Sequence, residues 1–147
     1  IVSESGHNKY FKAGLILPDF NVMSMKTQEI KAISDITQGI KHHLLLFAGT
    51  NSVDVSNLGE AAKKIDAAFA NIVSTHIILS NDILYPDCAA DIWLDDRQTV
   101  HHSFAIEQPM AILLRPDKYI GLLQAPVNIL ALINYLKKLY IGQNQTQ

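Results

Sequence analysis

Cysteine is nearly absent from this sequence. Its 147 residues include a single cysteine, Cys88, which excludes an internal disulfide and favours a reducing compartment. Glycine-rich phosphate loops, Gly-x-Gly-x-x-Gly and Gly-x-Ser-x-Gly are absent as well. These absences argue against the nucleotide sites and the serine nucleophile that such motifs build.

An excess of charge of one sign is also lacking. Twelve basic and 14 acidic side chains give a net charge of −2, so no basic footprint for nucleic acid is expected. The one long uncharged run, residues 119–136, is interrupted by Pro126 and by polar residues, which predicts a strand, a break and a helix rather than a membrane span. The N-terminus has no secretory signal. We therefore expect a soluble, cytoplasmic chain with neither nucleic-acid nor membrane partners.

Clusters with metal-ligand spacing are missing too. Histidines occur as two adjacent pairs, His42-His43 and His101-His102. Adjacent side chains diverge on a strand or a helix, so each pair offers one ligand at most to a common site. The aspartates within residues 87–96 lack the alternating pattern and distal glutamate of a calcium loop. The sequence predicts no metal site, surface or helix-capping histidines, and acids in a solvated loop.

Apolar residues are plentiful, at 48% of the chain, enough for the core of one domain. Residues 43–49 and 75–80 form short apolar runs, typical of strands buried on both faces. Between them, residues 57–73 carry apolar side chains at steps of three and four, which predicts an amphipathic helix. A strand, helix, strand unit with a right-handed crossover follows from this order.

Two more strands are predicted near the C-terminus. Residues 110–115 and 119–123 are apolar and flank Pro116-Asp117-Lys118, where proline presets the first dihedral of a tight turn. In this hairpin Asp117 can bond nearby backbone and Arg115 can bridge to an acid. We therefore interpret Arg115, Pro116 and Asp117 as a structural motif rather than an anion site.

Helices flank this hairpin. A short helix is predicted within residues 99–106. A closing helix is predicted after Pro126, which suits a first helical turn, and Gly142 is expected to end it. The resulting α/β arrangement, a mixed four-stranded core sheet flanked by helices, is that of the thioredoxin fold. An extra N-terminal strand and hairpin are predicted within residues 13–24 and 28–33.

The predicted domain organisation places a linker from a preceding domain in residues 1–12, the thioredoxin-like domain in residues 13–142, and a frayed tail in residues 143–147. The chain begins at Ile1 without an initiator methionine, so we expect it to be cut from a longer polypeptide. Thioredoxin-like domains usually carry a cis-proline just before the third core strand. Pro109 stands there, and we predict a cis bond.

Three stretches of the sequence resemble segments of known protein families. Residues 12–22, KAGLILPDFNV, resemble the entry of peroxiredoxin-like domains. Residues 95–121, DDRQTVHHSFAIEQPMAILLRPDKYIG, resemble the C-terminal domain of FAD-dependent aromatic hydroxylases of the phenol hydroxylase and hydroxyphenylpropionate hydroxylase kind, and IVSES is similar to the joining segment of those monooxygenases. The sequence departs from that pattern at Lys118, where the family usually has glycine.

This resemblance implies a non-catalytic domain without a catalytic, cofactor-binding or metal residue of its own. It would pack against a flavin-binding domain of the same polypeptide or form a subunit contact in a homo-oligomer. FAD and NAD(P)H would be bound by the parent oxidoreductase and not by this chain. Ile92, Trp93 and Leu94, flanked by acids, form a candidate contact patch, with a satellite core under a long loop as the alternative.

Two other functions stay open. The segment FAGTNSVDVSN, residues 47–57, lies where thioredoxins and peroxiredoxins need a reactive cysteine, and it contains none. A redox-inactive thioredoxin-like adaptor is therefore one alternative. A degenerate peroxiredoxin-type enzyme that uses Cys88 is the other, less favoured because its active-site segment lacks the cysteine.

Overall fold

The computed structural model describes residues 8–50, 56–81 and 91–145, which contain one mixed sheet of seven strands in the order β2-β1-β5-β4-β3-β6-β7. The strands are β1 (Asn21–Ser24), β2 (Ile30–Ala32), β3 (His42–Phe47), β4 (Val73–Leu79), β5 (Asp91–Leu94), β6 (Met110–Leu114) and β7 (Ile120–Gln124). The helices are α1 (Ile33–Ile36), α2 (Ser56–Phe69), the 3₁₀ turn η1 (Asp96–Gln98), α3 (Thr99–Ser103) and α4 (Ile129–Gln145).

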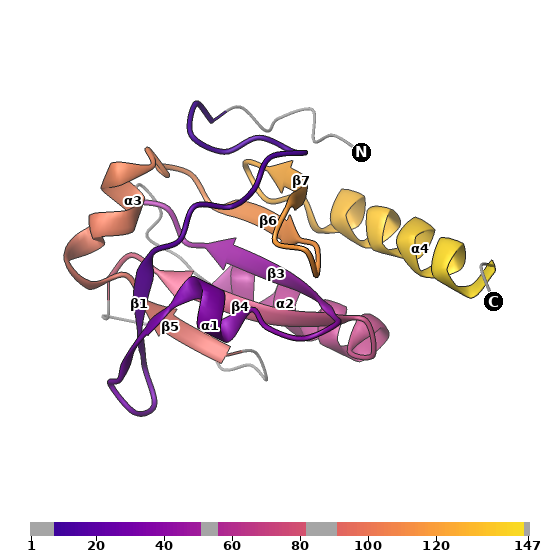
Figure 1. Ribbon diagram of the computed structural model, residues 1–147, viewed down its shortest axis with the longest axis horizontal. Coiled ribbons are helices and arrows are strands. Elements are labelled where there is room, and N and C mark those ends of the chain that lie inside the picture. The colour runs from indigo at the N-terminus through magenta and orange to yellow at the C-terminus, as the bar shows by residue number, and fades with distance from the viewer. Residues whose placement is uncertain (1–7, 51–55, 82–90, 146–147) are drawn as a thin grey trace.

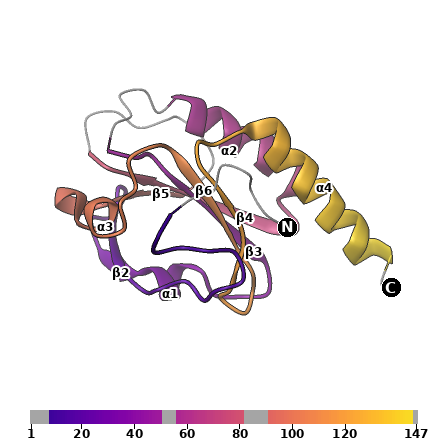
Figure 2. The same ribbon diagram turned by 90° about the horizontal axis from the view of Figure 1, so that it is seen from above.

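Helices cover both faces of the sheet. Figure 1 shows the sheet with α4 projecting at one end, and Figure 2 shows α2 and α4 on one face, with α1 and α3 on the other. Each face has its own hydrophobic cluster. No helix in the described part of the chain is long and apolar enough to cross a membrane.

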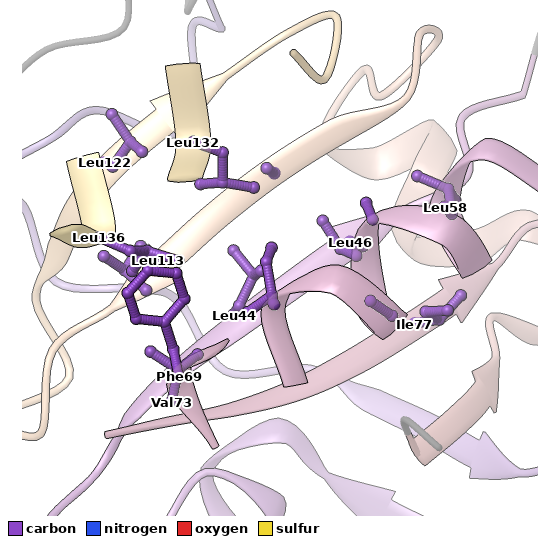
Figure 3. Close-up of a cluster of buried hydrophobic side chains, with 14 of the residues drawn as sticks. Leu44, Leu46, Leu58, Phe69, Val73, Ile77, Leu113, Leu122, Leu132 and Leu136 are labelled. Atoms are coloured by element: carbon purple, nitrogen blue, oxygen red, sulfur yellow. The ribbon is translucent and has the colours of Figure 1, made fainter. Parts of the chain in front are cut away.

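Side chains of the central strands alternate between the two clusters. On β3, Leu44 and Leu46 join the cluster under α2 and α4, while Leu45 and Phe47 join the other one. Figure 3 shows the first cluster, in which Leu136 of α4 lies among side chains of the strands and α2. Because a strand presents successive residues to opposite faces, an unbroken apolar run is required here.

The four strands of the predicted core sheet, β3, β4, β6 and β7, follow the predicted arrangement. β3 pairs in parallel with β4 and antiparallel with β6, and β6 pairs antiparallel with β7. The hairpin of β1 and β2 extends the sheet at its other end, so an N-terminal hairpin was predicted correctly. Residues of α1 were not predicted to be helical.

Residues 91–94 form strand β5, so the prediction that they lie in a loop is wrong. β5 pairs in parallel with β4, so that Trp93 lies opposite Ile78, and antiparallel with β1. Trp93 and Leu94 are each only 7% exposed, and Ile92 packs partly buried against the core. These side chains belong to the two clusters, because strand pairing turns them inward, and they form no exposed contact patch.

The β6–β7 hairpin contains the Arg-Pro-Asp stretch. The amide of Lys118 donates to the carbonyl of Arg115, and Arg115 Nη2 lies 2.6 Å from Asp117 Oδ2. Asp117 Oδ1 accepts the Tyr119 amide at 3.2 Å. Lys118 adopts a left-handed φ of 73°, the conformation for which glycine is the usual choice. Its ammonium group donates to the carbonyl and hydroxyl oxygens of Thr37.

Two details near the C-terminus differ from the predictions. Among the described residues the cis peptide bond joins Ala125 and Pro126, and the bond before Pro109 is trans. Pro109 directly precedes β6 and is an ordinary proline at a strand entry. The closing helix α4 passes through Gly142 and continues to Gln145, since glycine is tolerated inside a helix at a modest cost.

The free edge of β7 is covered by the N-terminal segment of residues 14–17. The Gly14 amide donates to the carbonyl of Ile120, and the Ile120 amide donates to the carbonyl of Leu15. The Leu17 amide donates to the carbonyl of Lys118. Ile16 and Tyr119 form an antiparallel bridge. The amide and carbonyl of Ile120 and the carbonyl of Lys118 are therefore paired within the chain at this edge of the sheet.

Candidate functional site

The carboxyl ends of β3, β4 and β5 meet at one edge of the sheet, where open α/β sheets bind their ligands. Gly49 follows β3 at a φ of +83°, and a Cβ there would lie 2.5 Å from the carbonyl carbon of Gln108. The Thr50 amide donates to Ile106 at 3.1 Å, and Ser80 Oγ donates to the Gly49 carbonyl at 3.0 Å. The turn after β3 is thus held tightly against the segment that leads into β6.

A groove of about 560 Å³ lies beside this turn. It is formed by the first turns of α2, by Pro109, and by the segment that leads into α4. The lining residues are Asn57, Leu58, Glu60, Ala61, Lys64, Pro109, Pro126, Val127 and Ile129. Most of the lining is apolar, with an acid and a base on the α2 side, a composition that suits a ligand with an apolar portion.

Asp95 and His101 form a buried pair at the same edge. Asp95 accepts the amides of Val100 and His101 at 2.9 and 2.6 Å, and its Oδ2 lies 2.7 Å from His101 Nδ1. The two side chains are 1% and 0% exposed. The carboxylate therefore satisfies two free amides at the start of α3 and orients the imidazole.

This pair has the hydrogen-bond arrangement of a catalytic aspartate–histidine dyad, but a substrate could not reach its imidazole. His101 Nε2 is buried and has no hydrogen-bond partner among the described residues. The ring instead packs edge-on against Phe47, with centroids 5.8 Å apart. A general base must reach the proton that it removes, so the arrangement supports a structural role for Asp95 and His101.

A second polar chain lies toward the amino ends of the strands. His43 of β3 and His76 of β4 share a hydrogen bond of 2.9 Å between Nδ1 and Nε2, and their rings stack. His76 Nδ1 lies 3.5 Å from Oδ2 of Asp91, the first residue of β5. Burial, followed by the neighbouring His76, lowers the pKa of His43 to about 4.

The sequence-based placement of several polar residues is therefore wrong. His43 and His101 are buried instead of lying on the surface, and Asp95 is buried instead of solvated. His43 is buried because β3 is an inner strand of the sheet, and His101 is buried because its ring packs against Phe47 of β3. Cys88 lies outside the described residues, so the structure places it at neither site. No group of three or more potential ligands in the described ranges could hold a metal ion.

Sequence reasoning missed His76 and the groove. His76 stands within an apolar run of a buried strand, THIIL, and a histidine at such a position requires a polar partner. The sequence therefore indicates a buried, hydrogen-bonded His76, but it does not indicate which residue is the partner. The groove combines α2, Pro109 and the start of α4, which are distant in sequence.

No family model matches this sequence, and no curated protein matches it. Solved structures do. A putative thiol:disulfide interchange protein DsbE from Chlorobium tepidum matches with a TM-score of 0.69 and 13% identity over 87% of this chain and 97% of that one. The thioredoxin domain of a thiol-disulfide oxidoreductase from Bacteroides vulgatus matches with 0.68 and 16%, over 88% and 98%.

A putative protein disulfide isomerase from Bacteroides thetaiotaomicron also matches, with a TM-score of 0.69 and 13% identity over 92% of each chain. These likenesses confirm the predicted thioredoxin-like fold. They also show that the resemblance to FAD-dependent aromatic hydroxylases is wrong, because the matching structures are thiol:disulfide interchange and related thioredoxin-like proteins. The expected partner, a flavin-binding domain of the same polypeptide, is wrong for the same reason. The expectation of FAD and NAD(P)H rested only on that resemblance and loses its basis.

Proposed function

We propose that this protein is a thioredoxin-like adaptor that binds a segment of another polypeptide without thiol–disulfide exchange. The observation that carries this proposal is the groove beside the turn after β3, in a chain whose corresponding segment has no cysteine. One of the solved structures that this chain resembles is named a putative protein disulfide isomerase. This chain has a groove that can bind a ligand, but residues 47–57 contain no reactive thiol.

The absence of thiol chemistry at this edge follows from the residues. Disulfide exchange requires a thiolate attacking a disulfide sulfur. Residues 47–57 contain no cysteine, and the chain has one cysteine in total. A dithiol cycle is therefore excluded within this chain, whatever the placement of Cys88.

The groove suits a short extended segment with an apolar side chain. Val127 and Ile129 are half-buried and Pro126 is exposed, so apolar surface is open to a partner on the α4 side. Glu60 and Lys64 are exposed on the α2 side and can bond a partner's backbone or polar side chains. Burying an apolar side chain of the partner supplies the affinity, and the polar residues orient it.

A selection of displayed peptides, followed by fluorescence anisotropy with the selected peptide, tests the proposal. We expect enriched peptides with a common apolar position, and we expect Val127→Asp to weaken their binding about tenfold or more, since a carboxylate would meet the apolar side chain. Leu130→Asp is the matched control, because Leu130 is 73% exposed and does not line the groove. Failure to enrich any peptide, or equal losses in both variants, would overturn the proposal.

The Cys88 alternative is separated by a second measurement. A Cys88→Ser variant should bind the selected peptide as the wild type does, and neither protein should catalyse the reduction of insulin by dithiothreitol. Catalysis that disappears in Cys88→Ser would favour a thiol enzyme. A cytoplasmic location and a homo-oligomeric state stay predictions; the single cysteine supports the former.

A further inference from the structure

A chain of polar contacts crosses three adjacent strands. His43 Nε2 lies 3.0 Å from the backbone carbonyl oxygen of Gln38, and His43 Nδ1 lies 2.9 Å from His76 Nε2. The other nitrogen of His76, Nδ1, lies 3.5 Å from Asp91 Oδ2 and has no hydrogen-bond partner among the described residues. The chain therefore joins the segment before β3 to β3, β4 and the first residue of β5.

This chain runs from the interior to solvent. His43 and His76 are 5% and 3% exposed, whereas the Asp91 side chain is 60% exposed. Polar groups buried to this degree need hydrogen-bond partners, and a bare one is costly. The positions of the ring protons are therefore constrained by the groups that each nitrogen faces.

The inner end of the chain determines the protons of His43. A backbone carbonyl only accepts hydrogen bonds, so His43 Nε2 must carry a proton and donate it to Gln38. A neutral His43 then has a bare Nδ1 that can only accept. His76 Nε2, which faces that atom, must carry a proton and donate it.

The outer end determines the remaining nitrogen. An ionised Asp91 only accepts, and contact with the His76 ring lowers the pKa of this carboxyl. A bare His76 Nδ1 would place two acceptors 3.5 Å apart, one of them buried. A proton on Nδ1 removes this conflict and makes His76 an imidazolium paired with Asp91.

We propose that the four ring nitrogens of His43 and His76 share three protons, so that His76 is a buried imidazolium whose charge ties the start of β5 to β4 and β3. The chain of contacts from Gln38 to Asp91 is thus a binding site for one proton. It exchanges that proton with solvent at Asp91, because Asp91 is the exposed member.

The surrounding charges agree with one positive charge rather than two. Lys118 bonds Thr37 next to the inner end and, together with His42 on the same strand, opposes a charge on His43. Lys26 lies near Asp91 and favours its ionised form. A second proton on the pair would also set two N–H groups facing each other across the 2.9 Å contact.

The direct test is the ¹⁵N spectrum of the imidazoles in histidine-labelled wild-type protein at pH 7. Two-bond nitrogen–proton correlations distinguish the two neutral tautomers from the imidazolium. We expect His76 to show two protonated nitrogens and His43 to show one, at Nε2. A neutral His76 in the folded wild-type protein would overturn the proposal, without involving any variant.

Asp91→Asn provides the second arm. An asparagine amide can donate to a bare Nδ1, so His76 should become neutral, and the amides of Ile92 and Trp93 should exchange faster with deuterium. Asp66→Asn is the matched control, because Asp66 lies on α2, which covers the opposite face of the sheet. An imidazolium that persists in a folded Asp91→Asn protein would show that Asp91 does not hold the charge, and would overturn the proposal.

Discussion

Two histidine–aspartate pairs stand at opposite ends of the parallel strands and differ mainly in exposure. His101 and Asp95 are both fully buried and 2.7 Å apart. His76 is buried as well, but its partner Asp91 is 60% exposed and 3.5 Å away. The same two residue types thus form a closed pair near the groove and an open pair at the start of β5.

The difference in burial between the two carboxylates indicates different roles for Asp95 and Asp91. Asp95 accepts three donors and is only 1% exposed, so removing its carboxylate leaves several buried groups without a partner. Asp91 is 60% exposed, so water and salt ions reach its carboxylate. The closed pair stabilises the fold, whereas the open pair can respond to the solution.

The largest expected effect comes from breaking the closed pair. Asp95→Asn should reduce the free energy of unfolding by about 3 kcal/mol, because an amide group replaces an acceptor among three donors in the interior. Urea unfolding at pH 7 measures the loss. The neighbouring Asp96→Asn is the control and should change stability by less than about 0.5 kcal/mol, since Asp96 is exposed. Equal losses would contradict the structural role of Asp95.

Acid should act on the chain that contains the open pair. The folded-state pKa of His43, about 4, lies below its ordinary 6.5, so the unfolded chain binds more protons between these values. Stability therefore falls as the pH is lowered from 6.5 toward 4, by about 2–3 kcal/mol in total. Urea unfolding at several pH values in this window measures the loss.

His43→Gln sharpens this prediction, because glutamine offers His76 an acceptor but does not titrate. The slope of stability against pH between 6.5 and 4 should shrink in this variant. His102→Gln, which alters an exposed histidine, should leave the slope unchanged. A slope that is the same in all three proteins would show that His43 does not titrate as inferred.

The smallest effect is expected from breaking the open pair. Asp91→Asn should lower the free energy of unfolding by about 1 kcal/mol, because the carboxylate that faces the buried His76 ring is itself 60% exposed. The difference from wild type should decrease in 1 M salt, which screens exposed pairs. The same salt should leave the loss in Asp95→Asn unchanged. A salt-independent loss at Asp91 would mean that the two pairs are alike.

Much of the fold could be predicted because its signals are local. The apolar runs around Leu45 and Ile78 predicted buried strands, and the spacing of Leu58, Ala62 and Ile65 predicted α2. The turn at Pro116 predicted the β6–β7 hairpin. In each case neighbouring residues alone determine the pattern.

The polar site could not be predicted in the same way. His43 and His76 are 33 residues apart, and their contact depends on the register between β3 and β4, in which Leu45 lies opposite His76. Pro86 and the acidic residues of the segment predict a loop over β5, and pairing with both β4 and β1 makes it a strand.

The cover that residues 14–17 provide over β7 has a consequence for how copies of this protein meet. A bare edge strand is a template onto which a strand of another molecule can add, which leads to domain swapping and fibrils. Here the amides and carbonyls of Ile120, and the carbonyl of Lys118, are already bonded to the chain's own N-terminal segment. The opposite edge, β2, is only three residues long. Strand addition by another molecule is therefore hindered at the start of β7, where these backbone groups are already bonded, and β2 offers only a short edge.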